Sequence, residues 1–247
     1  MDTKRFEEIK NSVAGTERAR GGIGTLQEKT VHAILKDYYA PDKDMQEIRV
    51  GGYVADIYDG KEIVEIQTSN FNKLRNKLDS FLPEHPVTLV YPVPQIKYLI
   101  WIDEETGECS KPRKSNVKGS VYRAFYELYK IKPYLSDENL HLCFPLLELE
   151  EYRLLNGWSR DRKKGSQRFD RIPTALLGEV RLDSVKDYAQ LIPAGLSEPF
   201  TVQEFGKAVK ERKETAAKVL HILHYLHIIE RCENRGKAYT YRIVKRG

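Results

Sequence analysis

The sequence predicts an α/β fold in which a mixed β-sheet is flanked by helices, followed by a small C-terminal domain. Two patterns lead to this expectation. Between residues 25 and 103, segments with helical spacing of apolar residues alternate with short strand-like runs. After residue 199, two helix-like segments precede two strand-like runs that flank a turn. Pro, Gly and Ser cluster between these patterns at 191–199, as they do in linkers. We therefore expect a larger domain over 1–181 and a smaller one over 182–247.

The composition predicts a cytoplasmic protein without membrane association. The chain of 247 residues contains no apolar run long enough for a transmembrane helix, which needs about 18 residues. Its first residues, MDTKRFEEIKNS, are charged and lack the apolar core of a secretory signal. The three cysteines lie far apart, without the spacing of a zinc knuckle, and we expect them to be reduced packing residues.

The elements of the larger domain follow from the spacing of apolar residues. Residues 1–20 are typical of a short amphipathic helix, and 25–39 of a helix with Val31 and Ile34 on one side. Three strands, a helix and two more strands are then expected at 46–50, 53–58, 62–68, 70–82, 86–93 and 96–103. A further helix at 121–131 and an added strand at 140–155 complete the domain.

Two basic segments interrupt these elements. The first, CSKPRKSNVKGSVYR, contains no acidic residue, and the second is WSRDRKKGSQRFDR at 158–171. Arg, Lys and backbone amides of such loops can contact phosphates, and we expect Arg113 and Lys114 of the first loop to do so with DNA. The alternative is that both segments are solvated surface loops, and Asp161 and Asp170 dilute the charge of the second.

The stretch GGYVADIYDGKEIVEIQT, residues 51–68, places acids where a strand would carry apolar residues. Asp59-Gly60 is typical of a two-residue hairpin turn, because both positions favour positive φ. With such a turn Asp56 faces Ile63, and Glu65 lies diagonally across from Asp56. Asp56, Glu65 and Gln67 then project from one face, with the acids about 7–8 Å apart at Cα.

Two carboxylates at this spacing can share one cation. They repel each other on a covered sheet unless a cation lies between them, and hard oxygen ligands suit Mg²⁺ or Mn²⁺. The hairpin therefore predicts a divalent-metal site at Asp56 and Glu65. The alternative is that the acids mark the solvated face of an edge hairpin.

The pattern D-x8-E-x-Q on a hairpin between two helices resembles the PD-(D/E)XK nuclease superfamily, over about the first 105 residues. The resemblance implies a restriction-endonuclease-like fold and a catalytic metal held by Asp56 and Glu65. Gln67 stands where the family usually has Lys; it can orient water but adds no charge. Lys73 or Lys77 of the following helix can supply that charge, as in some branches of the family, or can be ordinary solvated lysines.

Glu28 is a further catalytic candidate. The family often contributes an acid from its first helix, and Glu28 falls there, with His32 one turn further on. Glu28 also fits a capping box with Thr25, in which its carboxylate would bond the Thr25 amide. Both interpretations stay open.

The C-terminal segment carries the charge surplus of the chain. Eleven Lys or Arg stand against six Asp or Glu from Ser197 to Gly247, a surplus equal to the net charge of +5. Two helices, TVQEFGKAVK and KETAAKVLHILHYLHIIE, and two strands in RCENRGKAYTYRIVKR resemble a winged helix-turn-helix domain over 182–247. The resemblance implies DNA contacts from the second helix and the wing, at Lys213, Thr215, Lys218, His221, Arg235 and Lys237.

The expected function is that of a Mg²⁺-dependent (or Mn²⁺-dependent) endonuclease that hydrolyses DNA phosphodiesters and is delivered to duplex DNA by the winged helix. Cutting both strands usually calls for a homodimer. The alternative is a DNA-binding, regulator-like protein whose nuclease fold is catalytically silent. A third class is a protein-interaction module in which both folds serve assembly.

Overall fold

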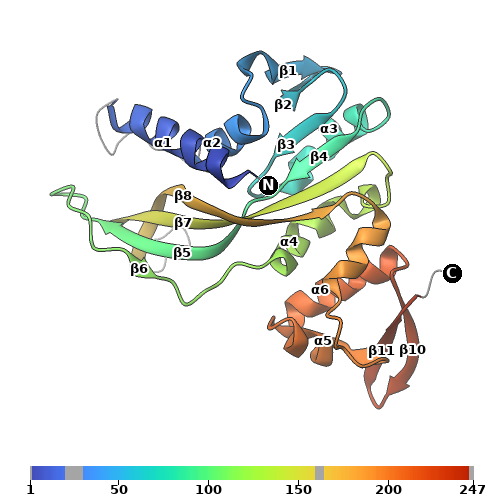
Figure 1. The fold of residues 1–247 in the computed structure, drawn as a ribbon. Helices are drawn as coiled ribbons and strands as arrows, with labels where there is room; N and C mark the ends of the chain where they lie inside the picture. Colours follow the sequence, from blue (N-terminus) through green and yellow to red (C-terminus); the bar gives the residue numbers. More distant parts are fainter. Residues whose placement is uncertain (1, 20–29, 159–163, 245–247) are drawn as a thin grey trace.

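The structure, a computed structural model, describes residues 2–19, 30–158 and 164–244. It is a mixed α/β fold, with a large sheet flanked by helices and a small separate antiparallel sheet at the C-terminus (Figure 1). The described part of the chain contains no helix with the length and apolar character needed to cross a bilayer. The fold class expected from the sequence is confirmed.

The large sheet has antiparallel and parallel parts. Its order is β1-β2-β3-β4-β7-β5-β6, with β8 paired to β7. The strands β1, β2 and β3 are antiparallel, whereas β3, β4, β7 and β5 are parallel neighbours. Their bounds are β1 Gln46–Val50, β2 Tyr53–Tyr58, β3 Ile63–Ile66, β4 Val87–Val90, β5 Val93–Ile102, β6 Arg113–Lys114, β7 Leu140–Trp158 and β8 Lys164–Leu182.

The long ribbon of β7 and β8 differs from the sequence expectation. Residues 164–171, expected in a basic loop, belong to β8 and pair with β7, while 159–163 lie outside the described residues. Charged side chains such as Arg171 are accommodated in the strand because β7 presents Glu151 opposite them. The sequence pattern of β8 alone does not show this partner.

Helices cover both faces of the sheet. On one face lie α1 (Thr3–Ala19) and α2 (Thr30–Tyr39), and on the other η2 (Phe71–Leu74), α3 (Arg75–Phe81), α4 (Val121–Leu128) and η3 (Tyr129–Tyr134). Successive residues of β4 show this directly, because Leu89 packs in the core with α3 and α4 and Val90 in the core with α1 and α2. A short turn, η1 (Lys43–Met45), leads into β1.

The C-terminal unit contains the expected helices and hairpin. Its elements are η4 (Val185–Leu191), β9 (Phe200–Thr201), α5 (Val202–Ala208), α6 (Lys213–Tyr225), β10 (Ile229–Arg235) and β11 (Ala238–Ile243). A capping box begins α5: the Glu204 amide donates to the Thr201 hydroxyl at 3.2 Å, and the Thr201 amide donates to the Glu204 carboxylate at 2.7 Å. The strands form a small sheet in the order β10-β11-β9.

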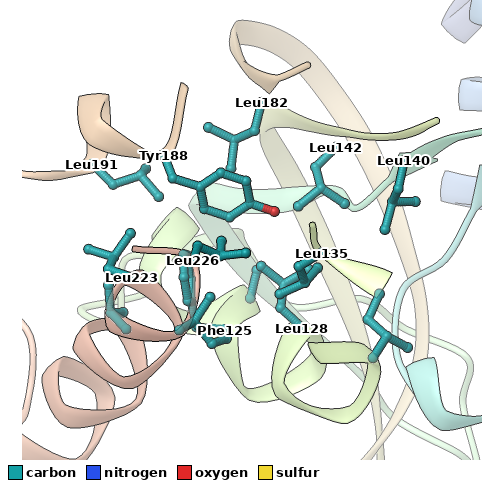
Figure 2. Close-up of a cluster of buried hydrophobic side chains, with 14 of the residues drawn as sticks. Phe125, Leu128, Leu135, Leu140, Leu142, Leu182, Tyr188, Leu191, Leu223 and Leu226 are labelled. Carbon is teal, nitrogen blue, oxygen red and sulfur yellow. The ribbon is translucent and has the colours of Figure 1, made fainter. Parts of the chain in front are cut away.

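The C-terminal unit shares its hydrophobic core with the larger part of the chain. Leu223 of α6 and Leu226, which directly follows α6, are buried beside Phe125 of α4. Tyr188 and Leu191 of η4 lie against the same cluster (Figure 2). Helix α6 therefore has α4 as its neighbour, a contact between segments about a hundred residues apart in the sequence.

Candidate functional site

The acidic hairpin has a wider turn than the sequence predicts. Ile57 pairs with Val64 and Tyr58 with Ile63, so four residues rather than two connect β2 and β3. The Asp59 carboxylate accepts hydrogen bonds from the amides of Lys61 and Glu62, both at 2.8 Å, and holds the wider turn. The expected pairing of Asp56 with Ile63 is therefore wrong.

The shift of register brings the two acids closer. Continuing the observed pairing places Asp56 opposite Glu65, instead of on a diagonal, and a shift of two residues leaves both on one face. At this point the Asp56 and Glu65 carboxylates accept hydrogen bonds from backbone amides of β2 and β3. The Asp56 amide donates to Glu65 Oε1 at 3.3 Å, and the Ile66 amide donates to Asp56 Oδ2 at 2.8 Å.

A basic side chain from a helix contacts each acid. His32 of α2 has its Nε2 3.1 Å from Asp56 Oδ2. Lys77 of α3 donates through Nζ to both oxygens of Glu65, at 2.9 and 2.8 Å. The row is therefore His32, Asp56, Glu65 and Lys77, contributed by four elements. His32 was not among the site residues expected from the sequence. Its position one residue after the buried Val31 was the available signal.

The environments of the two acids push their pKa values in opposite directions. Burial by itself raises the pKa of Asp56, but the hydrogen bond and charge of His32, the Ile66 amide and Lys77 together lower it below the ordinary value. Burial and the neighbouring Asp56 charge raise the pKa of Glu65 to about 7, against the opposing effect of Lys77. Glu65 is only 3% exposed, and this is why desolvation dominates.

The other catalytic candidates are placed differently. The side-chain amide of Gln67 donates through Nε2 to the Ser69 backbone carbonyl at 2.7 Å, so this side chain is hydrogen-bonded within the loop that follows β3. Of the two candidate lysines, the structure brings Lys77 to the acids, whereas Lys73 is exposed on η2. Glu28 lies outside the described residues.

The donor set fits a hard divalent ion. Asp56 and Glu65 offer carboxylate oxygens, and Mg²⁺ is usually bound by one or two carboxylates together with water and substrate oxygens. Within residues 2–19, 30–158 and 164–244, no three or more His, Cys, Asp or Glu side chains are grouped so that they could hold a metal. An ion at the acids would therefore complete its coordination with water and phosphate, and it would compete with Lys77 for Glu65.

A second charged cluster lies further along the sheet. The carboxylate of Glu151, which is 1% exposed, has Arg153 at 2.7 Å, Arg171 at 3.2 Å, Lys97 at 3.3 Å and Arg168 at 3.6 Å. One carboxylate and four cations give these five side chains a net charge of +3. Sequence analysis missed this cluster, because its members come from three different strands.

The expected DNA contacts on α6 are only partly exposed. Lys213 is exposed at the start of α6. Thr215 is only 5% exposed, so its expected outward position is wrong. Lys218 Nζ lies 4.2 Å from the centroid of the Tyr129 ring, and the His221 ring lies 5.2 Å from the same centroid. Both residues therefore contact η3, where Lys218 is half-buried and His221 stays exposed.

The remaining DNA candidates lie on strands or at the turn between two strands. Arg113 and Lys114 are exposed on β6, a short strand paired with β5, and not in a loop. Arg235 donates to the Glu204 carboxylate and to the Pro199 carbonyl, both at 2.7 Å, so its guanidinium is paired with groups of the C-terminal unit although the side chain is exposed. Lys237 is exposed at the turn between β10 and β11, in the place expected for a wing.

Comparison with known proteins gives a family without an assigned activity. The profile of the family described as "Domain of unknown function (DUF8091)" matches residues 29–183, which include both acids and Lys77. An "Uncharacterized protein" from Treponema pallidum (strain Nichols) is 34% identical over 151 residues, or 60% of this chain and 59% of that protein. The match thus spans less than two thirds of the length of that relative. No solved structure matches the chain.

Proposed function

This chain belongs to the DUF8091 family, and we propose that it is a Mg²⁺- or Mn²⁺-dependent endonuclease of the PD-(D/E)XK type that hydrolyses DNA phosphodiesters in the cytoplasm. The observation that carries the proposal is the row of His32, Asp56, Glu65 and Lys77. Two acids on adjacent strands, one of them fully buried, are costly unless cations are present. Here a lysine already occupies one carboxylate, and a divalent ion suits both.

Each residue of the row has a role in this reaction. Asp56 and Glu65 would hold the ion, which when bound acidifies a water molecule and neutralises charge that develops on the phosphate. His32 fixes the carboxylate of Asp56 through its 3.1 Å contact. Lys77, once it leaves Glu65, offers the positive charge that PD-(D/E)XK nucleases usually carry at the position of Gln67.

The C-terminal unit and β6 would supply DNA contacts. Lys213 and Lys237 are exposed on α6 and at the wing turn, and Arg113 and Lys114 on β6. Cations at these positions can contact phosphates without reading sequence. A homodimer would be needed to cut both strands of a duplex with one site per chain.

A specific observation favours a second candidate, a DNA-binding protein with a silent nuclease fold. Lys77 satisfies both oxygens of Glu65, and the Gln67 amide is bonded to the Ser69 carbonyl. In this arrangement Glu65 has a cationic partner without an ion. Such a protein would bind DNA and leave it intact.

Two measurements on the full chain separate these candidates. Calorimetric titration with Mn²⁺ should show binding that Asp56→Asn abolishes and that the exposed-site control Glu84→Gln retains. Supercoiled plasmid should be nicked with Mg²⁺ or Mn²⁺ by the wild type and by Glu84→Gln, but not by Asp56→Asn. Salt-sensitive DNA binding without nicking supports the silent candidate. If the protein binds neither Mn²⁺ nor DNA at low salt, the result supports the third class, a protein-interaction module in which both folds serve assembly.

A further inference from the structure

A groove lies at the junction between α4 and the turn that joins α5 to α6. It has a volume of about 740 Å³ and is formed by the loop 116–120, by Arg123 and Tyr126 of α4, and by residues 209–212. Its walls come from both parts of the chain, so it exists only because α6 packs against α4. None of the residues expected to be catalytic lines it.

The groove is basic. Lys118, Arg123, Lys210 and Arg212 line it, against Glu211 as the acidic lining residue. Glu211 pairs with Arg123 at 3.3 Å, which leaves three cations to act on a ligand. Lys210 has a φ of 56°, in the left-handed region that a lysine rarely adopts, so the turn holds this side chain at the groove at a conformational cost.

Exposed aromatic rings continue the groove along α4 and η3. Tyr126 and Tyr129 are each 42% exposed, although large aromatic side chains are usually buried. Lys218 Nζ lies 5.2 Å from the Tyr126 ring centroid and 4.2 Å from that of Tyr129. Exposed aromatic faces next to cations are typical of surfaces on which unpaired bases stack while their phosphates are neutralised.

The packing of α6 argues against the usual winged-helix docking. The major groove of duplex DNA is about 12 Å wide, and one helix with its side chains is about 10–12 Å across. The face of α6 that carries Lys218 and His221 lies against Tyr129, so α4 and η3 would have to enter the groove with it. A single strand, which is thinner and flexible, meets no such obstacle.

Two smaller spaces lie beside the groove. The first, of about 160 Å³, shares Gly119, Ser120 and Arg123 with the groove and is also lined by Lys97 and Pro94. The second, of about 10 Å³, is lined by Pro94, Arg171 and Thr68, and it has room for about one water molecule, so it is not a channel for a strand. Thr68 follows Glu65 by three residues, so at most about 11 Å of chain separates them. Lys97 and Arg171 belong to the cluster around Glu151.

We propose that this junction groove binds a single-stranded nucleic-acid segment, with phosphates at Lys118, Lys210 and Arg212 and bases stacked on Tyr126 and Tyr129. The strand then passes Lys97 and Arg171 to reach the acids. The binding step stands by itself, whereas delivery to the acids rests on the proposed nuclease function. A nuclease fed in this way would prefer single-stranded, frayed or flapped substrates to intact duplex.

Fluorescence anisotropy with the full chain in EDTA tests the binding step apart from catalysis. The probes are a labelled oligothymidylate of about 20 nucleotides, enough to span the roughly 4–16 nucleotides of a typical strand-binding site, and a blunt duplex of equal length. The groove variants are Tyr126→Ala and the double variant Lys210→Gln with Arg212→Gln. The matched controls away from the groove are Tyr239→Ala, whose ring is 53% exposed, and Lys186→Gln, a change at an exposed lysine of η4.

The single strand should bind more tightly than the duplex, and Tyr126→Ala should weaken it about tenfold, as expected for one lost stacking contact. The double variant should lower the slope of log affinity against log salt by about 1.4, or about 0.7 for each phosphate contact. The control variants should stay within about twofold of the wild type, a difference too small for a lost stacking contact. The proposal is overturned if the duplex binds better, if the control variants weaken binding more than the groove variants, or if polyglutamate competes as well as the oligonucleotide. Unchanged melting temperatures establish that the variants are folded.

Discussion

Glu65 should make the protein less stable as the pH rises, and Glu65→Gln should remove this dependence. The folded protein raises the pKa of Glu65 to about 7 from the ordinary value of 4.5, because burial and the Asp56 charge disfavour its ionised form. One pKa unit corresponds to about 1.4 kcal/mol, so the shift corresponds to about 3 kcal/mol of folding free energy. That is a large share of the roughly 5–15 kcal/mol by which domains are stable.

The sign of the effect follows from proton binding. Between pH 4.5 and about 7 the folded protein keeps a proton on Glu65 that the unfolded chain has lost. The stability from this group is therefore complete below the unfolded pKa and is lost as the pH rises through the folded pKa. Asp56 has its pKa lowered, so its contribution is present at higher pH and is lost only as the pH falls below its ordinary value of 3.8. The two acids thus titrate in separate windows.

Urea unfolding, followed by tryptophan fluorescence at a series of pH values, measures the effect. Glutamine resembles the protonated acid, so wild type and Glu65→Gln should have similar unfolding free energies near pH 4.5, while the variant should be more stable by about 3 kcal/mol near pH 8. Groups remote from Glu65 contribute equally to both proteins, so their contributions cancel in the difference between the two curves. Glu84→Gln, a change at an exposed acid, should follow the wild type. Parallel curves for wild type and Glu65→Gln would refute the reasoning.

Three further predictions test the neighbouring features. Lys77→Met should tighten Mn²⁺ binding in calorimetric titration while abolishing any nicking, because Lys77 occupies both oxygens of Glu65; unchanged affinity would show that lysine and metal do not compete. Leu223→Ala, at a site with no exposed surface, should cost about 2–5 kcal/mol in urea unfolding and lower one common melting transition in calorimetry; two separate transitions would contradict the shared core. Glu151→Gln should destabilise by about 3 kcal/mol in urea unfolding, because it leaves four cations without their buried carboxylate; a change of less than about 0.5 kcal/mol, typical of a surface substitution, would show that solvent already screens these cations.

The sequence was sufficient for the parts of the fold and site that depend on local periodicity. The bounds expected for β1 and β2 agree with the structure, and the acids share one face because alternation along a strand does not depend on the register. The exact pairing was not predictable in the same way. Asp59 bonds two amides of its own turn, and this side-chain contact converts the expected two-residue loop into four residues.

Other features depend on contacts between distant segments. Lys73 and Lys77 look alike in the sequence, and only the packing of α3 decides that Lys77 reaches Glu65. The polar half of β8 forms a strand because Glu151 lies opposite it on β7. Likewise, Lys218 lies off the apolar stripe of α6 and would be solvated on an isolated helix, but its contact with Tyr129 of η3 leaves it half-buried. Local pattern cannot report such partners.

The charge distribution gives the two acids and the Glu151 cluster complementary roles. Asp56 and Glu65 together carry up to two negative charges, and Lys77 offsets one of them. A bound divalent ion would change the net charge of this group from negative to positive. The Glu151 cluster carries a net +3 and contributes Lys97 and Arg171 to the path from the groove. A phosphate backbone is attracted to the cluster whether or not an ion is bound, but it approaches the acids favourably only when one is. The path would therefore bind a strand without metal and present its phosphate to the acids with metal, so loss of Asp56 should separate the two steps.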